Sequence, residues 1–357
     1  MIDLIKPAFI AGHEIRFSDF ISKLGKEKIA IVSHRVDLDG ITAAKVVNKV
    51  VNADEIIFLD YEDINLELVE RLEKGKFKKV IFTDLNFSKP EVLKKIEKFA
   101  EVLVIDHHTF AEDLNSERTV FMNSQGFCAA YIAYYLFSKI QNLEDLDWVV
   151  ACASISDVMY KNNAKWIGNV CQKYDGFFRI NQKGMVESSL EELQYNINLA
   201  ILYFNHVRKP QIALNSIGER YGDIGGLMKY ADMVRKEVEN TKIMFVKQKE
   251  KIGEFTYWKI KKMKYSIVSF LINDISFSQR DRTFIFLEKQ SEICKVSARR
   301  QDWKLDLPSL LKSLIIGFEN SSAGGHIPAS GASFPVSYLA EFEKRLKAVS
   351  LDKFIVK

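Results

Sequence analysis

The segment EVLVIDHHTF, residues 101–110, joins a short apolar run to the polar triplet Asp106-His107-His108. Two of the six histidines of the chain therefore stand together after what reads as a buried strand. Three earlier segments have the same form, a β-branched run that ends in a polar residue and leads into a helical pattern: KIAIVSH (28–34), EIIFLD (55–60) and KKVIFTD (78–84). Strands that are apolar throughout are typical of a parallel sheet covered by helices on both faces. Their alternation with helices predicts a doubly wound α/β domain.

The sequence after this pattern predicts more helices. Two apolar helices are expected at 126–140 and 147–156, and they would complete a first domain over residues 1–185. From 186 to 250 the pattern is helical, increasingly charged and without a strand signal. This stretch is therefore interpreted as a helical connector.

The pattern changes again after Gly253 and predicts a second, smaller domain over residues 251–357. Its expected elements are strands at 255–260, 265–272, 282–289 and 291–300, a helix at 308–316, a glycine-rich turn and a final helix at 335–348. This mixture predicts an α+β fold with a cleft between the two domains, where a substrate could bind.

Composition limits the class of protein. With 357 residues and 47% hydrophobic side chains, the chain can build a large core. A net charge of +4 argues against a binder of long duplexes and is compatible with a short nucleotide ligand. The four cysteines form no CxxC pair and are expected to be buried thiols. No stretch approaches the roughly 18 apolar residues of a membrane span, so we expect a cytoplasmic protein with no membrane partner.

Potential metal ligands follow several apolar segments in the first domain. A single carboxylate after a strand is more often a helix cap than a ligand. Here, however, SHRVDLDG (33–40) alone holds three candidates within the six residues from 34 to 39, and later segment ends add more. In an open parallel sheet, the carboxyl ends of the strands line one crevice, so distant residues can converge there. The candidates are His34, Asp37, Asp39, Asp84, Asp106, His107, His108 and Asp157.

The residue types of this set point to particular metals and to a reaction class. Carboxylate oxygens and imidazole nitrogens without a thiolate favour Mn²⁺, with Mg²⁺ as the alternative, over structural zinc. The set exceeds what one ion needs and matches two ions that share a bridging carboxylate. Such pairs activate water and stabilise in-line displacement at phosphorus. The sequence therefore predicts hydrolysis of a phosphoester or phosphoanhydride.

A second signal lies in the C-terminal domain, in SSAGGHIPASGASFP at 321–335. Adjacent glycines let backbone amides approach an anion closely, and a histidine can donate to a phosphate oxygen. Alone, this is more often a tight turn. Together with SARR at 297–300, where arginine can bind phosphate through two hydrogen bonds, it predicts a substrate clamp.

These motifs resemble those of the DHH phosphoesterase superfamily, named for the run at 106–108. The resemblance implies that one Mn²⁺ is bound by His34 and Asp37, the other by Asp39, His107 and Asp157, with Asp84 bridging both. It implies further that Asp106 orients a neighbouring imidazole, that His108 faces the substrate as phosphate ligand or general acid, and that a substrate phosphate is held by Arg299 or Arg300, Gly324, Gly325 and His326. Many relatives have a third glycine where this chain has Ala323, which would be strained if φ had to be positive there.

The superfamily includes RecJ-type exonucleases, nanoRNases, cyclic-dinucleotide phosphodiesterases and pyro- or polyphosphatases. The Gly-Gly-His element resembles the nucleotidyl branch. We therefore expect an enzyme: a Mn²⁺-dependent exonuclease or oligoribonuclease that acts on single-stranded RNA or DNA, short oligonucleotides or nucleotides and releases nucleoside 5′-monophosphates. The alternatives are a soluble phosphodiesterase for cyclic dinucleotides or a pAp phosphatase, and an inactive relative that serves replication or repair partners as a scaffold.

Overall fold

The computed structural model describes residues 2–87, 89–182 and 185–356. The chain divides into two compact units, Met1–Met233 and Val234–Lys357, and the boundary falls within helix α10 (Met228–Gln248). The three-part division into 1–185, 186–250 and 251–357 stays a prediction. Among the described helices, none is both long enough and apolar enough to cross a lipid bilayer.

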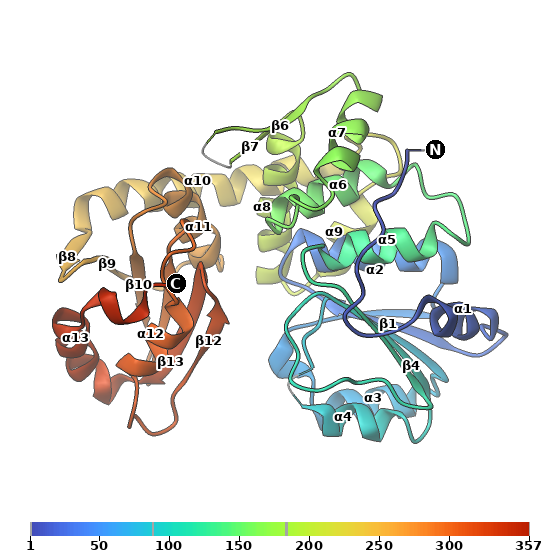
Figure 1. Ribbon diagram of the computed structural model, residues 1–357, viewed down its shortest axis with the longest axis horizontal. Coiled ribbons are helices and arrows are strands. Elements are labelled where there is room, and N and C mark those ends of the chain that lie inside the picture. Colours follow the sequence, from blue (N-terminus) through green and yellow to red (C-terminus); the bar gives the residue numbers. More distant parts are fainter. Residues whose placement is uncertain (1, 88, 183–184, 357) are drawn as a thin grey trace. The chain divides into compact units, whose positions relative to one another are not determined.

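The first unit contains a five-stranded sheet in the order β2-β1-β3-β4-β5, with every neighbouring pair parallel. Helices lie on both faces of this sheet, α2 and α5 on one and α3 and α4 on the other (Figure 1). The predicted doubly wound α/β fold is therefore confirmed. The strands are β1 (Ile29–His34), β2 (Glu55–Leu59), β3 (Lys79–Thr83), β4 (Glu101–Asp106) and β5 (Thr119–Asn123).

The register of this sheet brings polar residues to one edge. Ser33 pairs with Thr83, Thr83 with Ile105, and Ile105 with Met122, so these residues form one row across four strands. On each of these strands, the residue that follows this row lies at the carboxyl edge of the sheet. These residues are His34, Asp84, Asp106 and Asn123. Because all strands are parallel, the candidates His34, Asp84 and Asp106 lie side by side at this edge.

The helices of the first unit are mostly those that the sequence indicates. The apolar segments at 126–140 and 147–156 form α5 (Ala129–Phe137) and α6 (Asp147–Ser156), both buried. The segment expected to be helical from 186 begins instead with β7 (Val186–Ser188), which pairs with β6 (Phe178–Ile180). The remaining helices are α1 (Glu14–Ser22), α2 (Leu38–Val51), α3 (Leu66–Lys74), α4 (Pro90–Ile96), α7 (Ala164–Lys173), α8 (Glu191–His206) and α9 (Pro210–Ser216).

The second unit is built on a six-stranded mixed sheet in the order β12-β13-β11-β10-β9-β8. A buried cluster of aliphatic and aromatic side chains, with Leu310, Leu311 and Phe342 among them, packs on one face. The predicted α+β character is confirmed. The elements are β8 (Glu250–Ile252), β9 (Phe255–Ile260), α11 (Val268–Ser278), β10 (Phe284–Lys289), β11 (Ile293–Arg299), α12 (Leu307–Leu314), β12 (Ser322–His326), β13 (Ala329–Pro335) and α13 (Leu339–Ala348).

Two local expectations for the second unit are wrong. The strand expected at 265–272 lies largely in helix α11, because β9 and β10 are parallel and parallel strands need a crossover rather than a tight turn. The glycine-rich turn expected within 321–335 is a hairpin of β12 and β13. Both segments take the structure that the sheet topology demands rather than the one that their local composition favours.

Candidate metal centre

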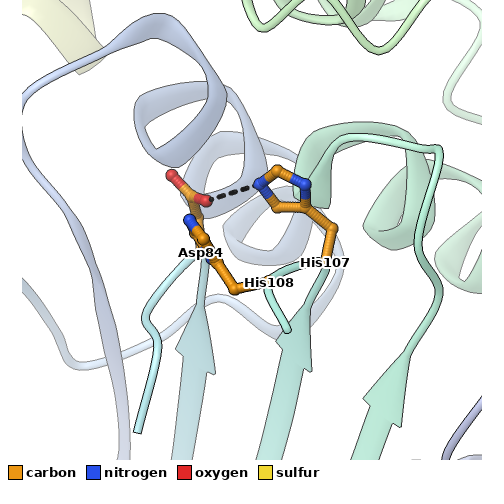
Figure 2. Close-up of side chains that lie close together, drawn as sticks. All are labelled: Asp84, His107 and His108. Atoms are coloured by element: carbon orange, nitrogen blue, oxygen red, sulfur yellow. Dashed lines mark ion pairs between the residues drawn. The ribbon is translucent and has the colours of Figure 1, made fainter. Parts of the chain in front are cut away.

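The centre is built around Asp84, at the end of β3. Its Oδ2 lies 3.3 Å from Nδ1 of His34, and its Oδ1 lies 3.4 Å from Nε2 of His107. Figure 2 shows Asp84 and His107 facing each other from the ends of adjacent strands. The backbone of Asp84 has φ 56°, a left-handed conformation that is uncommon for a residue with a side chain. One carboxylate thus faces two imidazoles that come from different strands.

The first turn of α2 supplies two further carboxylates. Asp37 caps this helix by accepting a hydrogen bond from the amide of Gly40 (3.1 Å), while its Oδ2 lies 3.1 Å from Nδ1 of His34. Asp39 is buried, and its two oxygens accept hydrogen bonds from the amides of Ala129 (2.8 Å) and Ala130 (2.7 Å) at the start of α5. These bonds hold Asp39 with its Oδ2 3.8 Å from Nε2 of His107.

Gly40 lets α2 begin directly against β1. A Cβ atom at this position would lie 2.3 Å from the carbonyl oxygen of His34, so no other residue fits without movement of the backbone. The hydroxyl of Ser33 donates to the carbonyl of Gly40 (2.7 Å) and accepts from Thr83 (2.7 Å). The glycine of the HRVDLDG motif is therefore a packing requirement that fixes where Asp37 and Asp39 point.

The last carboxylate comes from the end of α6. Asp157 is the C-cap residue of this helix, and its Oδ2 lies 3.6 Å from Nε2 of His107. The next residue, Val158, has φ 61°, which is a strained conformation for a β-branched side chain. Such strain is common where the chain must aim a functional side chain.

Three groups of side chains offer ligand atoms that lie within 4.8 Å of one another. They are His34, Asp37 and Asp84; Asp39, His107 and Asp157; and Asp84, His107 and His108. The structure therefore brings together all six residues expected to bind metal. Asp84 belongs to two groups, as a shared carboxylate should.

The protonation of the centre is strongly perturbed. Burial opposes protonation of His34 and His107, but the surrounding carboxylates outweigh it and raise the pKa of both imidazoles. Burial raises the pKa of Asp157 to about 7 and, with the nearby carboxylates Asp84 and Asp157, raises that of Asp39. For Asp84, the two imidazoles that face its oxygens outweigh burial and lower its pKa. Charges of both signs are thus confined among largely buried side chains.

A divalent cation fits this centre. Nδ1 of His34, Oδ2 of Asp84 and Oδ2 of Asp157 are buried atoms that have no hydrogen-bond partner in the described part of the chain. Buried polar atoms without partners are costly, and a cation would satisfy them together. The donors are oxygens and imidazole nitrogens without a thiolate, as Mn²⁺ and Mg²⁺ prefer. The Asp/His cluster is therefore a divalent metal site.

Asp106 contacts His108, the second histidine of the run. Its Oδ1 lies 2.8 Å from Nδ1 of His108, and its Oδ2 accepts from the backbone amide of the same residue (3.3 Å). Asn123, at the end of β5, donates to the carbonyl of His108 (2.9 Å). An ionised carboxylate can only accept, so Asp106 places the proton of a neutral His108 on Nδ1 and leaves Nε2 with its lone pair.

Two residues beside the centre were missed by the sequence analysis. Oδ1 of Asp60 lies 3.6 Å from Nε2 of His34, and Asp60 also pairs with Arg35 (2.6 Å). The hydroxyl of Tyr61 lies 3.2 Å from Nε2 of His108. Asp60 ends the segment EIIFLD in the same manner as the polar residues that end the other strands, so this pattern could have identified it. Nothing in the sequence distinguishes Tyr61.

The clamp candidates of the second unit lie on neighbouring strands. Arg299 pairs with Ala329, and Ala329 pairs with His326, so Arg299 and His326 occupy one row with a small residue between them. Residues directly opposite in antiparallel strands share a face of the sheet, so both side chains leave the same face. Gly325 has φ 133°, and a Cβ there would lie 2.4 Å from the carbonyl oxygen of Ala329. Its neighbour Gly324 lies in the same strand.

The two arginines differ in their partners. Nε of Arg299 donates to Oδ1 of Asn273 (2.5 Å), and burial lowers the pKa of Arg299 to about 10. Arg300 instead binds Asp302 through two hydrogen bonds of 2.9 Å and 3.0 Å. The charge of Arg300 is therefore met by a carboxylate of the chain, whereas Nε of Arg299 meets a neutral amide.

The alanine that replaces a glycine of this motif is not strained. Ala323 lies in β12, where it pairs with Ala332, and it is not among the described non-glycine residues with positive φ. The strand conformation is open to any residue. The departure noted in the sequence therefore leaves the backbone of this hairpin intact.

Comparisons with known proteins agree with this geometry. A model of the DHH family, N-terminal domain, matches residues 28–161, which include every residue of the centre. No curated protein matches the sequence significantly.

Solved structures share the fold. RecJ from Thermus thermophilus in complex with Mn²⁺ has a TM-score of 0.68 at 15% identity, over 96% of this chain and 55% of that chain. The same protein with Mg²⁺ has a TM-score of 0.60 at 14% identity, over 97% and 53%. An exonuclease RecJ bound to manganese has a TM-score of 0.66 at 15% identity, over 98% and 96%. This chain thus spans about half the length of the Thermus protein.

Proposed function

We propose that this chain, which belongs to the DHH family of metal-dependent phosphoesterases through residues 28–161, is an exonuclease or oligoribonuclease. Its substrates are single-stranded or short nucleic acids, from which it releases nucleoside 5′-monophosphates. The observation that carries the proposal is the carboxylate of Asp84, whose two oxygens face His34 and His107 separately. A carboxylate in that position can bridge two cations, as in two-metal sites that catalyse displacement at phosphorus.

The proposed ligands follow from the groups of side chains. His34 and Asp37 bind one ion, Asp84 bridges, and the second ion takes the set Asp39, His107 and Asp157. When bound, such a pair lowers the pKa of a water molecule and neutralises charge on the phosphate oxygens. Mn²⁺ is the proposed ion and Mg²⁺ the alternative, since RecJ of Thermus thermophilus was crystallised with each.

Side chains that are not metal ligands transfer a proton and bind the substrate phosphate. His108 faces the phosphate and gives a proton to the leaving oxygen, while Asp106 holds its ring through Nδ1 (2.8 Å). Burial opposes protonation of His108, but Asp106 outweighs it and raises its pKa, which favours the acid form. In the second unit, Arg299, His326 and the amides of Gly324 and Gly325 bind a substrate phosphate, with Arg300 as the weaker candidate.

The direct test is hydrolysis of end-labelled RNA and DNA of two to twenty nucleotides, with Mn²⁺ and after chelation. We expect nucleoside monophosphates as products with Mn²⁺ only, and far slower release by His108→Ala. An Asp281→Asn variant, altered at an exposed carboxylate of the second unit, should match the wild-type protein. Absence of metal-dependent monophosphate release from every substrate would refute the proposal.

The same assay separates the alternatives. If pAp or a cyclic dinucleotide is hydrolysed faster than a five-nucleotide oligomer, the chain is a nucleotide phosphatase or phosphodiesterase rather than an exonuclease. An inactive scaffold would bind no stoichiometric metal. The complete donor set around Asp84 argues against that third alternative.

A further inference from the structure

Tyr61 contacts two histidines of the centre at once. Its ring stacks on the ring of His34, with centroids 4.6 Å apart and planes at 25°. It meets the ring of His108 edge-on, at 5.7 Å and 83°. Its hydroxyl lies 3.2 Å from Nε2 of His108. A single side chain thus links a proposed metal ligand from β1 to the proposed phosphate-facing histidine after β4.

The turn that carries Tyr61 is held in place from both ends. Tyr61 begins a short 3₁₀ turn (Tyr61–Asp63) directly after β2. Asp60 and Asp63 form a capping box across this turn, in which the amide of Asp60 donates to Asp63 (3.0 Å). Asp60 is itself fixed by Arg35. Because its backbone is fixed, Tyr61 can restrain the ring of His108 and does not simply move with that ring.

The hydroxyl of Tyr61 meets the nitrogen of His108 that Asp106 leaves available. Asp106 binds Nδ1 of His108, so only Nε2 can face a substrate. A tyrosine hydroxyl both donates and accepts, so it can bond to Nε2 in the neutral and in the protonated imidazole. With 37% of Tyr61 exposed, this contact lies where solvent or a ligand can reach it.

We propose that Tyr61 is a positioning residue for His108. Before substrate binds, its hydroxyl and the Asp106 carboxylate hold the two ring nitrogens from opposite sides. The ring is therefore already oriented when the leaving oxygen replaces the hydroxyl at Nε2. Its ring, stacked on His34, also supports that imidazole beside Asp37 and Asp84. This proposal deepens the proposed function and rests on it for the role of His108, but the two contacts can be tested without substrate.

Two variants separate the hydroxyl from the ring. Tyr61→Phe keeps the ring on His34 and removes the hydrogen bond. We expect kcat to fall about tenfold, which corresponds to the ~1.4 kcal/mol of one hydrogen bond, with KM and Mn²⁺ affinity within about twofold. Tyr61→Leu removes the ring as well and should also weaken Mn²⁺ binding several-fold. Tyr221→Phe is the matched control, because Tyr221 has the same exposure, 38%, and stacks on Tyr174 away from the centre.

A double-mutant cycle identifies the residue through which Tyr61 acts. If its hydroxyl works by positioning His108, Tyr61→Phe should have no further effect on kcat in a His108→Ala background. An equal loss of kcat in both backgrounds would overturn the proposal, as would a Tyr61→Phe variant with unchanged kcat.

A measurement without substrate keeps the test independent of the proposed function. In ¹⁵N-histidine NMR spectra, Tyr61→Phe should move the Nε2 resonance of His108 and leave its Nδ1 resonance, held by Asp106, almost unchanged. If the protein hydrolyses no nucleic acid but this shift is present, the contact stands and the proposed function fails. If hydrolysis occurs and the Nε2 resonance does not move, the proposal for Tyr61 fails alone.

Discussion

Oδ1 of Asp84 lies 3.4 Å from Nε2 of His107, while the other oxygen of the same carboxylate faces Nδ1 of His34 at 3.3 Å. Each histidine therefore faces a different oxygen of the Asp84 carboxylate. The left-handed backbone of Asp84 (φ 56°) aims the carboxylate in this direction. Because of this division, Asp84 can belong to one ligand group with His34 and to another with His107.

Removing either histidine should therefore remove one ion and spare the other. In His34→Ala, the group Asp39, His107 and Asp157 remains complete and Asp84 still faces His107. In His107→Ala, the group His34, Asp37 and Asp84 remains complete. We expect about one Mn²⁺ per chain in each variant by metal analysis after gel filtration. Retention of two ions, or loss of both in each variant, would be inconsistent with separate ligand groups.

Metal binding should release protons. In the metal-free protein, carboxylates raise the pKa of His34 and His107 against the effect of burial, and burial raises the pKa of Asp157 to about 7. These groups must lose protons before they can bind a cation. Mn²⁺ affinity should therefore rise between pH 6 and pH 8, with at least one proton released, as calorimetry in buffers of different ionisation enthalpy can measure. A Mn²⁺ affinity that does not change with pH would contradict the predicted release of protons.

The metal-free protein should be less stable at pH 8 than at pH 5. The folded-state pKa of Asp157 is about 7 against ~3.9 in an unfolded chain, so the folded state holds the extra proton between these values. His34 and His107 also have raised pKa values, and their contribution is lost as pH rises through those values. Both effects lower the free energy of unfolding as pH rises. Urea titrations at both pH values test this, and saturating Mn²⁺ should remove or reverse the trend.

Gly40→Ala should destabilise the protein. The new Cβ would lie 2.3 Å from the carbonyl oxygen of His34, so β1 and α2 would have to separate, at a cost of about 1–3 kcal/mol. Gly168→Ala is the matched control: Gly168 lies inside α7 with no heavy atom within 4 Å of the added Cβ, and alanine should stabilise that helix by up to ~1 kcal/mol. Urea unfolding of both variants measures the difference. Equal effects would refute the packing role of Gly40.

Arg299→Met should weaken substrate binding more than Arg300→Met. Arg300 is already paired with Asp302 through two hydrogen bonds, whereas Arg299 donates to the neutral amide of Asn273. A charged hydrogen bond to phosphate contributes ~1.5–3 kcal/mol, so KM should rise roughly ten- to hundredfold for Arg299→Met. Steady-state kinetics with a short oligonucleotide would measure KM for both variants. A larger rise in KM for Arg300→Met than for Arg299→Met would contradict the prediction that Arg299 contributes more to substrate binding.

Much of the first unit could be predicted from sequence, for a physical reason. Its strands are apolar throughout because both faces are covered, and each ends in a polar residue at one edge of the sheet. Parallel topology alone then brings His34, Asp84 and Asp106 together. The class of metal follows from the residue types of the candidate ligands, which are aspartate and histidine without cysteine.

What sequence analysis missed depends on tertiary contacts. Strand β5 is a run of five residues, TVFMN, whose strand character comes from its pairing with β4. Helix α11 has a strand-like composition and is helical because it must cross between parallel strands. The contact between Tyr61 and His108 exists only once a three-residue turn after β2 meets the loop after β4.

Anomalous diffraction from crystals grown with Mn²⁺ would show whether a pair of divalent ions shares Asp84. We predict two manganese peaks, one on each oxygen of Asp84 and beside His34 and His107 respectively. Asp84→Asn, which keeps the shape and removes the charge, should lose this pair, while Asp281→Asn should retain it. A single peak in the wild-type protein, or two undiminished peaks in Asp84→Asn, would refute a pair of ions that shares Asp84.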